Sequence, residues 1–462
     1  MKIVVNKIVE LCSGKLLCGD GNVILKKLVI DTRMLEYGDT FVGIKGENYN
    51  GNDFLYDAVE KGANCVILDE NKDITDISIP IILVSDSSKA LGIIASYIRN
   101  NSDSIFIGVT GSVGKTSTRD MIYSVLNESH PTLKTENNYN NNIGLPLTIS
   151  KLCDERFAVI EMGMNHLGEI SYLSNIVKPN IGVITNVGTA HIGILGSRKN
   201  ILKAKLEILD GMDDSSTLII NNDNDLLHNW YEENKDKLNI KTYGIKEKSD
   251  LNAKNIKLES SNSKFDLKLN GKEETINVPV GGEHFILNSL CAAMVGKVLK
   301  IDNQKIKEGI ESFELTKKRM DITELENGVK VINDAYNASL ESMKASLGVL
   351  SEFKENRKIA ILGDMFELGK YSKELHKKVG EEVIKNKIDI LICSGTNSKY
   401  IIEKAREKMK DENVYYLENK EEILEVLKEV IKPGDVVLLK ASNGMKFYEL
   451  AERMISLWKK KD

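Results

Sequence analysis

The feature that most constrains the fold is a glycine-containing turn between a short apolar run and a helical pattern. The apolar run covers residues 105–109, the turn contains Gly111 and Gly114, and the helical pattern starts at about Lys115. Glycines in such a turn let backbone N–H groups converge on phosphate oxygens at a helix N-terminus, where the helix dipole also favours an anion. The segment therefore predicts a phosphate-binding loop at the end of a strand.

The residues after the second glycine suit phosphoryl chemistry. Lys115 can place a positive charge beside the transferred phosphoryl group, and the Thr116 hydroxyl can ligate Mg²⁺. Val109 occupies the first glycine position of the usual pattern, so the match is Gly111-x-x-Gly114-Lys115-Thr116. A phosphate loop alone leaves a GTPase switch, a kinase, a motor and a ligase open.

Strand-like apolar runs alternate with helical patterns along most of the chain, which is typical of α/β folds with parallel sheets. The pattern divides the 462 residues into three blocks, and this length also suits about three domains. In the first block, the glycine-rich stretch 38–51 is predicted to form loops. In the second, Asn270-Gly271 is predicted to be a hairpin turn between two strands. The predicted domains are residues 1–85, 86–313 and 314–462.

The composition narrows the class of protein. The 63 Lys and Arg residues against 68 Asp and Glu residues leave a net charge of −5, so no nucleic-acid partner and no membrane insertion are expected. Six scattered cysteines include no C-x-x-C pair, which argues against a disulfide framework and a zinc site. Lys7 and Glu10 interrupt the apolar core that a signal peptide needs, and we therefore expect a cytoplasmic protein.

Three further residues are candidates for the same site. Glu161 ends the predicted strand 157–161, where its carboxylate could serve as a second Mg²⁺ anchor. His191 follows the predicted strand 181–185 and is placed for ligation, although a lone histidine is more often structural. Lys205 lies on a predicted helix, where a solvated lysine is the default.

Several longer segments share a resemblance to one family. They are TGSVGKTS, TENNYNNNIGLPLT, EMGMNHLGEI, ITNVGTAHIGILGS, AKLEI, GGEHFILNSLCAA, NDAYNASLESM and ILGDMFELG. In sequence and order they resemble the ATP-dependent Mur ligases over essentially the whole chain, in the branch that adds D-Ala-D-Ala to UDP-MurNAc-tripeptide. The resemblance implies an N-terminal UDP-binding domain, a central P-loop ATPase domain with a parallel sheet, and a C-terminal Rossmann-like domain.

The resemblance also implies roles for individual residues. Lys115, Lys205, His191 and Arg319 would be catalytic, and Lys205 would be carbamylated, which requires a lysine with a lowered pKa. Mg²⁺ would be held by Thr116, Glu161, His191 and the Lys205 carbamate. ATP would contact Gly111, Ser112, Val113, Gly114, Lys115, Thr116, Ser117, His284, Asn288, Arg319 and Asp334, the last of these near the ribose. The UDP-sugar would contact Asp31, Thr32, Arg33, Lys45 and Gly46, and the dipeptide would arrive near Tyr336 and Asn337.

The implied reaction is ATP-dependent amide formation through an acyl phosphate by a monomer. Three positions depart from the family pattern: Asn333 replaces an aspartate, Leu340 replaces a proline, and Ala441-Ser442-Asn443 replaces Gly-Ser-Arg, which removes a glycine and a cation near the dipeptide. A sister ligase, adding the third stem-peptide residue or a glutamate to folate, is one alternative. A non-catalytic nucleotide-binding scaffold is another.

Overall fold

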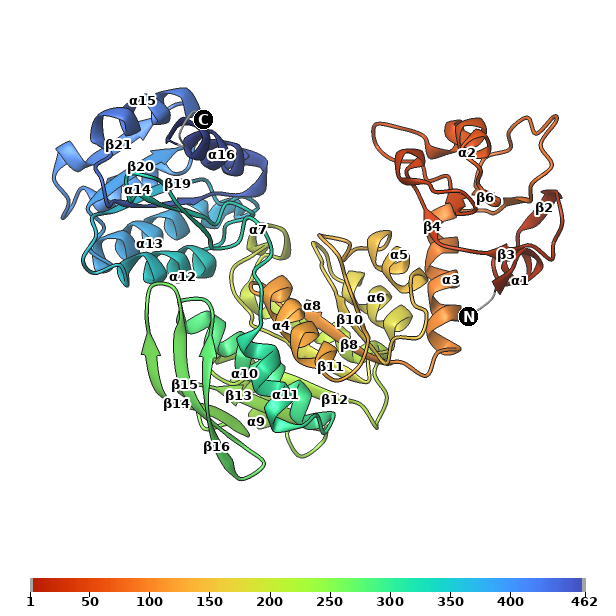
Figure 1. The fold of residues 1–462 in the computed structure, drawn as a ribbon, viewed down its shortest axis with the longest axis horizontal. Coiled ribbons are helices and arrows are strands. Elements are labelled where there is room, and N and C mark those ends of the chain that lie inside the picture. The colour runs from red at the N-terminus through yellow and green to blue at the C-terminus, as the bar shows by residue number, and fades with distance from the viewer. Residues whose placement is uncertain (1–2, 459–462) are drawn as a thin grey trace.

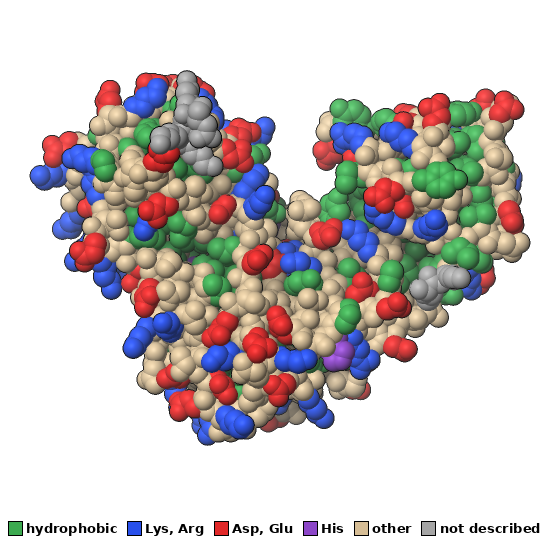
Figure 2. Space-filling view, viewed as in Figure 1, with side chains coloured by type: hydrophobic (Ala, Val, Ile, Leu, Met, Phe, Trp, Pro, Cys, Tyr) green, Lys and Arg blue, Asp and Glu red, His purple; other side chains and the backbone are tan. Residues whose placement is uncertain are grey.

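The computed structural model describes residues 3–458, which form three lobes (Figure 1). We call residues 3–86 the N-terminal lobe, 87–311 the middle lobe and 321–458 the C-terminal lobe, and residues 312–320 the linker. The N-terminal lobe, red and orange, and the C-terminal lobe, blue, stand on opposite sides of the middle lobe. A deep notch separates the two outer lobes in the space-filling view (Figure 2).

The N-terminal lobe is built on a five-stranded sheet in the order β2-β7-β6-β5-β4, parallel except for β2. Its elements are β1 (Ile3–Val4), α1 (Val5–Leu11), β2 (Lys15–Cys18), β3 (Ile24–Leu25), β4 (Leu28–Val29), β5 (Thr40–Val42), α2 (Leu55–Glu60), β6 (Cys65–Leu68) and β7 (Ile81–Leu83).

The prediction of loops over residues 38–51 was wrong at β5. This strand has only three residues, but all three are buried and pair with strands on both sides. A three-residue apolar run is too short to show the alternation by which a strand is predicted, and the glycine-rich segments on both sides favour loops.

The middle lobe contains a nine-stranded sheet in the order β16-β15-β14-β13-β12-β11-β8-β10-β9. The strands from β14 to β9 run parallel, and β14, β15 and β16 form an antiparallel extension whose β15–β16 turn is Asn270-Gly271, as predicted. The strands are β8 (Ile105–Thr110), β9 (Thr132–Lys134), β10 (Phe157–Glu161), β11 (Ile181–Ile184), β12 (Thr217–Asn221), β13 (Ile240–Gly244), β14 (Leu251–Leu258), β15 (Ser263–Leu269) and β16 (Lys272–Val278).

The topology places the phosphate loop at a point where the strand order reverses. After β8 the chain forms β9 and β10 on one side, and then β11, β12 and β13 on the other. Open parallel sheets bind ligands at the carboxyl ends of strands at such a point. The helices around this sheet are α3 (Ser87–Asn100), α4 (Lys115–Asn127), α5 (Gly144–Ser150), α6 (Glu169–Val177), α7 (Ile192–Leu195), α8 (Arg198–Leu206), α9 (Asp225–Asn234), α10 (Glu283–Val298) and α11 (Asn303–Glu311).

The C-terminal lobe is a second α/β unit with a six-stranded sheet in the order β17-β18-β22-β19-β20-β21, parallel except for β17. Its strands are β17 (Asp321–Glu324), β18 (Lys330–Asn333), β19 (Lys358–Gly363), β20 (Ile390–Ser394), β21 (Val414–Leu417) and β22 (Val436–Lys440). Its helices are α12 (Leu340–Ser351), α13 (Ser372–Lys385), α14 (Lys399–Ala405), α15 (Lys420–Val430) and α16 (Phe447–Trp458).

The α/β class with sheets rich in parallel strands is as predicted. Parallel strands are buried on both faces, which is why β8, β10, β11 and β12 are continuous apolar runs. Across residues 3–458, none of the helices combines the length and the apolar character needed to cross a membrane.

Candidate active site

The phosphate loop joins β8 to α4 as the sequence predicts. Gly111 has φ +151° and Gly114 has φ +81°, backbone conformations that residues with a Cβ rarely adopt. A Cβ on Gly111 would lie 1.9 Å from the Thr185 hydroxyl, so this position requires glycine. The loop ends at the first turn of α4, where backbone N–H groups have no partner within the helix and can face an anion.

The Lys115 side chain folds back over its own loop. Its ammonium group donates to the carbonyl oxygen of Gly111 at 2.9 Å. Burial lowers the pKa of Lys115, while the carboxylate of Glu161 acts in the opposite direction. The ammonium therefore lies over the loop that is expected to hold the phosphates.

Thr116 and Glu161 meet at the carboxyl edge of the sheet. The Thr116 hydroxyl donates to Oε2 of Glu161 at 3.0 Å, and Asn140 donates to Oε1 at 2.8 Å. Arg119 also donates to Oε2, at 3.2 Å. Both oxygens of this buried carboxylate are therefore hydrogen-bonded.

His191 lies on the loop before α7 and faces the C-terminal lobe. Its backbone has φ +63°, and its Nδ1 lies 2.5 Å from a carboxylate oxygen of Glu367. Two further contacts hold α7, which follows His191: the N–H of Gly193 donates to the Glu367 carbonyl at 2.9 Å, and the Tyr371 hydroxyl donates to the carbonyl of Gly196, at the end of the helix, at 2.6 Å. The segment around His191 is thus clamped by the C-terminal lobe.

Lys205, on α8, is not the solvated lysine that is the default on a helix, because only 1% of its surface is exposed. Burial lowers its pKa far below the ordinary lysine value, and the nearby charge of Lys115 lowers it further. This lowered pKa is the property that carbamylation requires, and a solvated lysine would not have it.

The donor set suits Mg²⁺. No group of three or more His, Cys, Asp or Glu side chains that could hold a metal on its own occurs within residues 3–458. Mg²⁺ usually binds through one or two carboxylates together with phosphate oxygens and waters, so such a group is not needed. The Thr116 hydroxyl and the Glu161 carboxylate, 3.0 Å apart, are oxygen donors of this kind.

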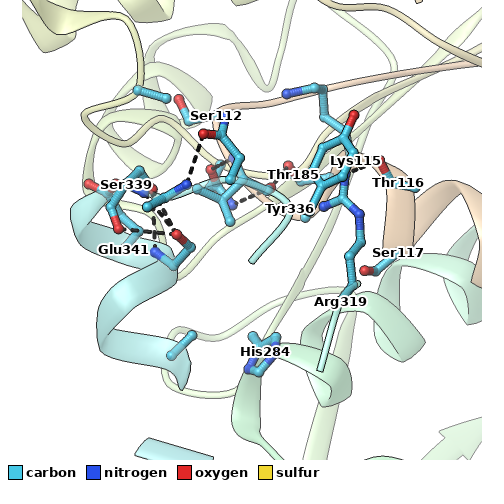
Figure 3. Close-up of a pocket in the computed structure, with 18 of the residues that line it drawn as sticks. Ser112, Lys115, Thr116, Ser117, Thr185, His284, Arg319, Tyr336, Ser339 and Glu341 are labelled. Atoms are coloured by element: carbon cyan, nitrogen blue, oxygen red, sulfur yellow. Dashed lines mark hydrogen bonds between the residues drawn. The ribbon is translucent and has the colours of Figure 1, made fainter. Parts of the chain in front are cut away.

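The candidate residues surround a cavity of about 540 Å³ between the middle and C-terminal lobes (Figure 3). Its lining includes 14 of the predicted site residues: Ser112, Val113, Gly114, Lys115, Thr116, Ser117, Glu161, His191, His284, Asn288, Arg319, Asp334, Tyr336 and Asn337. Gly111 and Lys205 do not line the cavity.

One end of the cavity is formed by the start of α10. His284 is partly buried there, and burial lowers its pKa to about 4, with Asp334 opposing this effect and Lys440 adding to it. Asn288 accepts a hydrogen bond from the Thr118 hydroxyl at 3.0 Å. The imidazole of His284 is consequently neutral near pH 7, when it can donate one hydrogen bond and accept another.

Arg319 enters the cavity from the linker. Its Nη2 donates to the Thr116 hydroxyl at 2.9 Å, and the guanidinium carbon lies 4.1 Å from the centre of the Tyr336 ring. Figure 3 shows the Tyr336 ring lying against this guanidinium. The structure thus places Tyr336 beside a predicted ATP contact, in addition to its predicted place on the dipeptide side.

Asp334 is held by neighbours that the sequence analysis did not identify. Lys440 donates to Oδ2 at 2.5 Å, Ser346 donates to Oδ2 at 2.6 Å, and the N–H of Met320 donates to Oδ1 at 3.2 Å. Lys440 is 2% exposed and ends the apolar strand β22. A lysine in such a run was the available signal, because a buried ammonium requires an anionic partner.

The five predicted UDP contacts lie elsewhere, in the N-terminal lobe. Asp31 and Arg33 form an ion pair at 2.7 Å, and Lys45 lies 3.5 Å from Glu70. The pKa of Arg33 is raised by its hydrogen bond to Asp31 and, as a smaller effect, by Tyr49. The N–H of Gly46 donates to the Tyr49 carbonyl at 2.9 Å. Asp31, Thr32, Arg33, Lys45 and Gly46 do not line the cavity.

Comparisons with known proteins agree on one family. The Mur ligase middle domain matches residues 109–296, and the Mur ligase, glutamate ligase domain matches residues 318–443. The UDP-N-acetylmuramoyl-tripeptide–D-alanyl-D-alanine ligase of Bacillus subtilis is 34% identical over 458 residues, covering 98% of this chain and 99% of that protein. The protein of the same name from Synechocystis is 36% identical over 424 residues, covering 91% and 90%.

Solved structures give the same result. A crystal structure of MurF from Acinetobacter baumannii has a TM-score of 0.89 with 28% identity and covers 99% of both chains. The MurF ligase of Thermotoga maritima, in complex with ADP, has a TM-score of 0.81 with 28% identity and covers 94% of this chain and 97% of that one. The domain matches and these relatives show that this chain belongs to the Mur ligase family.

Proposed function

We propose that this protein is an ATP-dependent ligase that joins D-Ala-D-Ala to UDP-MurNAc-tripeptide through an acyl phosphate, a step in the synthesis of peptidoglycan precursors. The observation that carries the proposal is the cavity in which the phosphate loop, Glu161 and His191 of the middle lobe meet Arg319. Full-length relatives that carry this activity in their names support the choice of substrates.

In the first step, an oxygen of the tripeptide carboxylate attacks the γ-phosphorus of ATP. The bond from that phosphorus to the β,γ-bridging oxygen breaks, and ADP leaves with the electron pair. The ammonium of Lys115 and the guanidinium of Arg319 stabilise the negative charge that moves onto the phosphoryl oxygens. Phosphorylation is needed because an unactivated carboxylate would have to expel oxide.

In the second step, the free amine of the dipeptide attacks the acyl carbon. The tetrahedral intermediate collapses as the carbon–oxygen bond to phosphate breaks, and the amine nitrogen loses a proton. The products are an amide and inorganic phosphate. Tyr336 and Asn337 lie on the C-terminal side of the cavity, and we propose that the dipeptide approaches from there.

Thr116, Glu161 and His191 would hold Mg²⁺, which when bound neutralises charge on the phosphates. We propose that Lys205 completes the site as a carbamate, in which its neutral amine adds to CO₂ and releases one proton. Its burial and lowered pKa support this assignment. A carbamate carries the negative charge that a cationic lysine beside Lys115 would lack.

We propose that the three predicted domains divide the substrates among them. Residues 1–85 would hold the UDP-sugar, 86–313 ATP and 314–462 the dipeptide. One chain supplies all the residues that line the cavity, which is compatible with a monomer. We place the protein in the cytoplasm because that is where ATP and UDP-linked precursors occur.

The test is phosphate release from ATP and Mg²⁺ in the presence of UDP-MurNAc-tripeptide and D-Ala-D-Ala, with each component omitted in turn. We expect release only in the complete mixture, together with a product heavier by one dipeptide less one water. Release with a different amine would indicate a sister ligase. ATP binding without release in the complete mixture would contradict the proposal and favour a scaffold.

A further inference from the structure

Two neighbouring charged residues on α4 are buried but have no place in the mechanism above. Arg119 is 2% exposed and Asp120 is 4% exposed, and neither lines the cavity. Burying charged groups costs free energy unless they are paired and hydrogen-bonded. The contacts of this pair therefore indicate what the fold gains from them.

Arg119 links Asp120 to the candidate metal anchor. Its Nη2 donates to Oδ1 of Asp120 at 2.7 Å, and its Nη1 donates to Oε2 of Glu161 at 3.2 Å. The Lys134 ammonium also donates to Asp120, at 3.0 Å. Two cations and two anions are thus joined in one neutral cluster.

Asp120 also reaches the linker. Its Oδ2 accepts a hydrogen bond from the hydroxyl of Thr316, a residue 196 positions later in the chain. Three residues further along the linker, Arg319 donates to the hydroxyl of Thr116 at 2.9 Å. Thr116 and Asp120 are four residues apart and therefore lie on the same face of α4. The linker is fastened to the phosphate-loop helix at both points.

These contacts close into a ring. The Thr116 hydroxyl donates to Glu161 at 3.0 Å while accepting from Arg319, so the ring runs from the linker through Thr116, Glu161, Arg119 and Asp120 back to the linker. Two members, Thr116 and Glu161, are the oxygen donors assigned to Mg²⁺. Once they turn toward a cation and phosphates, the Thr116 contacts with Glu161 and Arg319 must change, whereas Asp120 can keep Thr316.

We propose that Arg119 and Asp120 are positioning residues that couple the phosphate site to the linker. We call the Arg319–Thr116 hydrogen bond, which breaks when the site fills, the tie. We call the Asp120–Thr316 hydrogen bond, which remains, the pivot. The placement of the C-terminal lobe thereby depends on whether the phosphate site is occupied. The inference rests on the proposed function only in taking Thr116 and Glu161 as groups that bind metal and phosphate.

The experiment removes the pivot without touching the cavity. Thr316→Val replaces the hydroxyl by a methyl group, and Thr316→Ser keeps it. Thr323→Val is the matched control, because Thr323 lies just beyond the linker on β17 and no side-chain hydrogen bond is found for it in the described structure. Each protein is measured by calorimetry and by small-angle X-ray scattering, with and without MgCl₂ and the non-hydrolysable ATP analogue AMPPCP.

We expect Thr316→Val to bind Mg-AMPPCP about three- to tenfold more weakly than wild type, within the range of coupling between residues in one network. Its scattering in the presence of the nucleotide should show a larger radius of gyration, because neither the tie nor the pivot then holds the linker. Thr316→Ser and Thr323→Val should match wild type. Thr316→Val indistinguishable from wild type in both measurements would overturn the inference.

A double-mutant cycle tests whether the pivot affects nucleotide binding through the ring of hydrogen bonds. Arg119→Lys keeps the charge but cannot contact Asp120 and Glu161 together. In that background, Thr316→Val should change the affinity by less than about twofold, because the ring is already open. If the effects of Arg119→Lys and Thr316→Val on the affinity are additive, the two residues act independently, which would contradict the coupling.

The outcomes separate this inference from the proposed function. Wild-type protein that binds Mg-AMPPCP but ligates no dipeptide would defeat the proposed function and leave the coupling intact. If the wild-type protein ligates the dipeptide but Thr316→Val binds nucleotide and scatters like wild type, the proposed function stands and the coupling is overturned. Wild-type protein that binds no nucleotide would defeat both.

Discussion

Lys115 places an ammonium group directly over the phosphate loop. Replacing it by alanine removes the ammonium over Gly111 but no contact of the apolar core. We expect Lys115→Ala to fold and to lose product formation by at least about 100-fold, as when one transition-state contact is removed. Lys199→Ala, on the exposed start of α8, is the control and should keep its activity. Substantial ligation by Lys115→Ala would refute the phosphate-loop assignment.

The state of Lys205 can be observed directly. With ¹³C-bicarbonate, we expect a carbamate carbon signal by NMR, because burial lowers the pKa of the Lys205 amine and so favours the neutral form that adds to CO₂. The signal should disappear in Lys205→Met, which fills the same space without an amine. It should persist in Lys203→Met, an exposed position on the same helix. A signal that survives in Lys205→Met would place the carbamate on another residue.

The lowered pKa of His284 predicts a dependence of stability on pH. The folded protein keeps this imidazole neutral down to about pH 4, whereas the unfolded chain takes up a proton near 6.5. Stability from this group is therefore complete above pH 6.5 and is lost as the pH falls toward 4. Relative to His284→Gln, wild type should lose about 2 kcal/mol between pH 7.5 and pH 5 in thermal unfolding.

An NMR titration checks the same prediction independently. One imidazole resonance, absent from His284→Gln, should stay unshifted from pH 8 to pH 5. A midpoint near 6.5 for that resonance would show that the imidazole is not buried as described.

Two glycines inside helices have opposite surroundings, so alanine should have opposite effects on stability at the two positions. Gly348 lies inside α12, and a Cβ there would meet no atom within 4 Å. Gly348→Ala should raise the free energy of unfolding by about 0.5–1 kcal/mol, because glycine is the poorer helix former. Gly309 lies inside α11, where a Cβ would be 2.4 Å from the Cα of Val125. Gly309→Ala should be destabilising, and calorimetry on both variants provides the comparison.

The sequence predicts elements well where an apolar run is long and bounded. The strand predicted over residues 157–161 is β10 with the same limits, because five buried residues in a row favour a central parallel strand. The three-residue strand β5 escaped prediction because its neighbours are glycine-rich loops. Partners such as Thr316 and Asp120 were also beyond reach, since no local pattern reports a hydrogen bond across 196 residues. Most of the predicted residues that do line the cavity came from the family resemblance.

For the whole molecule, the separation of the candidate sites predicts where ligands protect the backbone from hydrogen exchange. ADP with Mg²⁺ should slow exchange in residues 111–117 and leave the segments around Arg33 and Lys45 unchanged. UDP should give the opposite pattern, because these segments lie outside the cavity. Protection of the N-terminal segments by ADP alone would show that the two sites are not separate.

The notch between the outer lobes sets a minimum length for a substrate that must reach from one lobe to the other (Figure 2). If the nucleotide end of the precursor is held by the N-terminal lobe while phosphoryl transfer takes place beside the middle and C-terminal lobes, the diphosphate, the sugar and the peptide arm together must cover the distance between them. A precursor with a shorter arm would be captured by its uridine end but would leave its carboxylate short of the phosphate loop. On this arrangement, the spacing of the lobes makes the length of the precursor a determinant of the reaction.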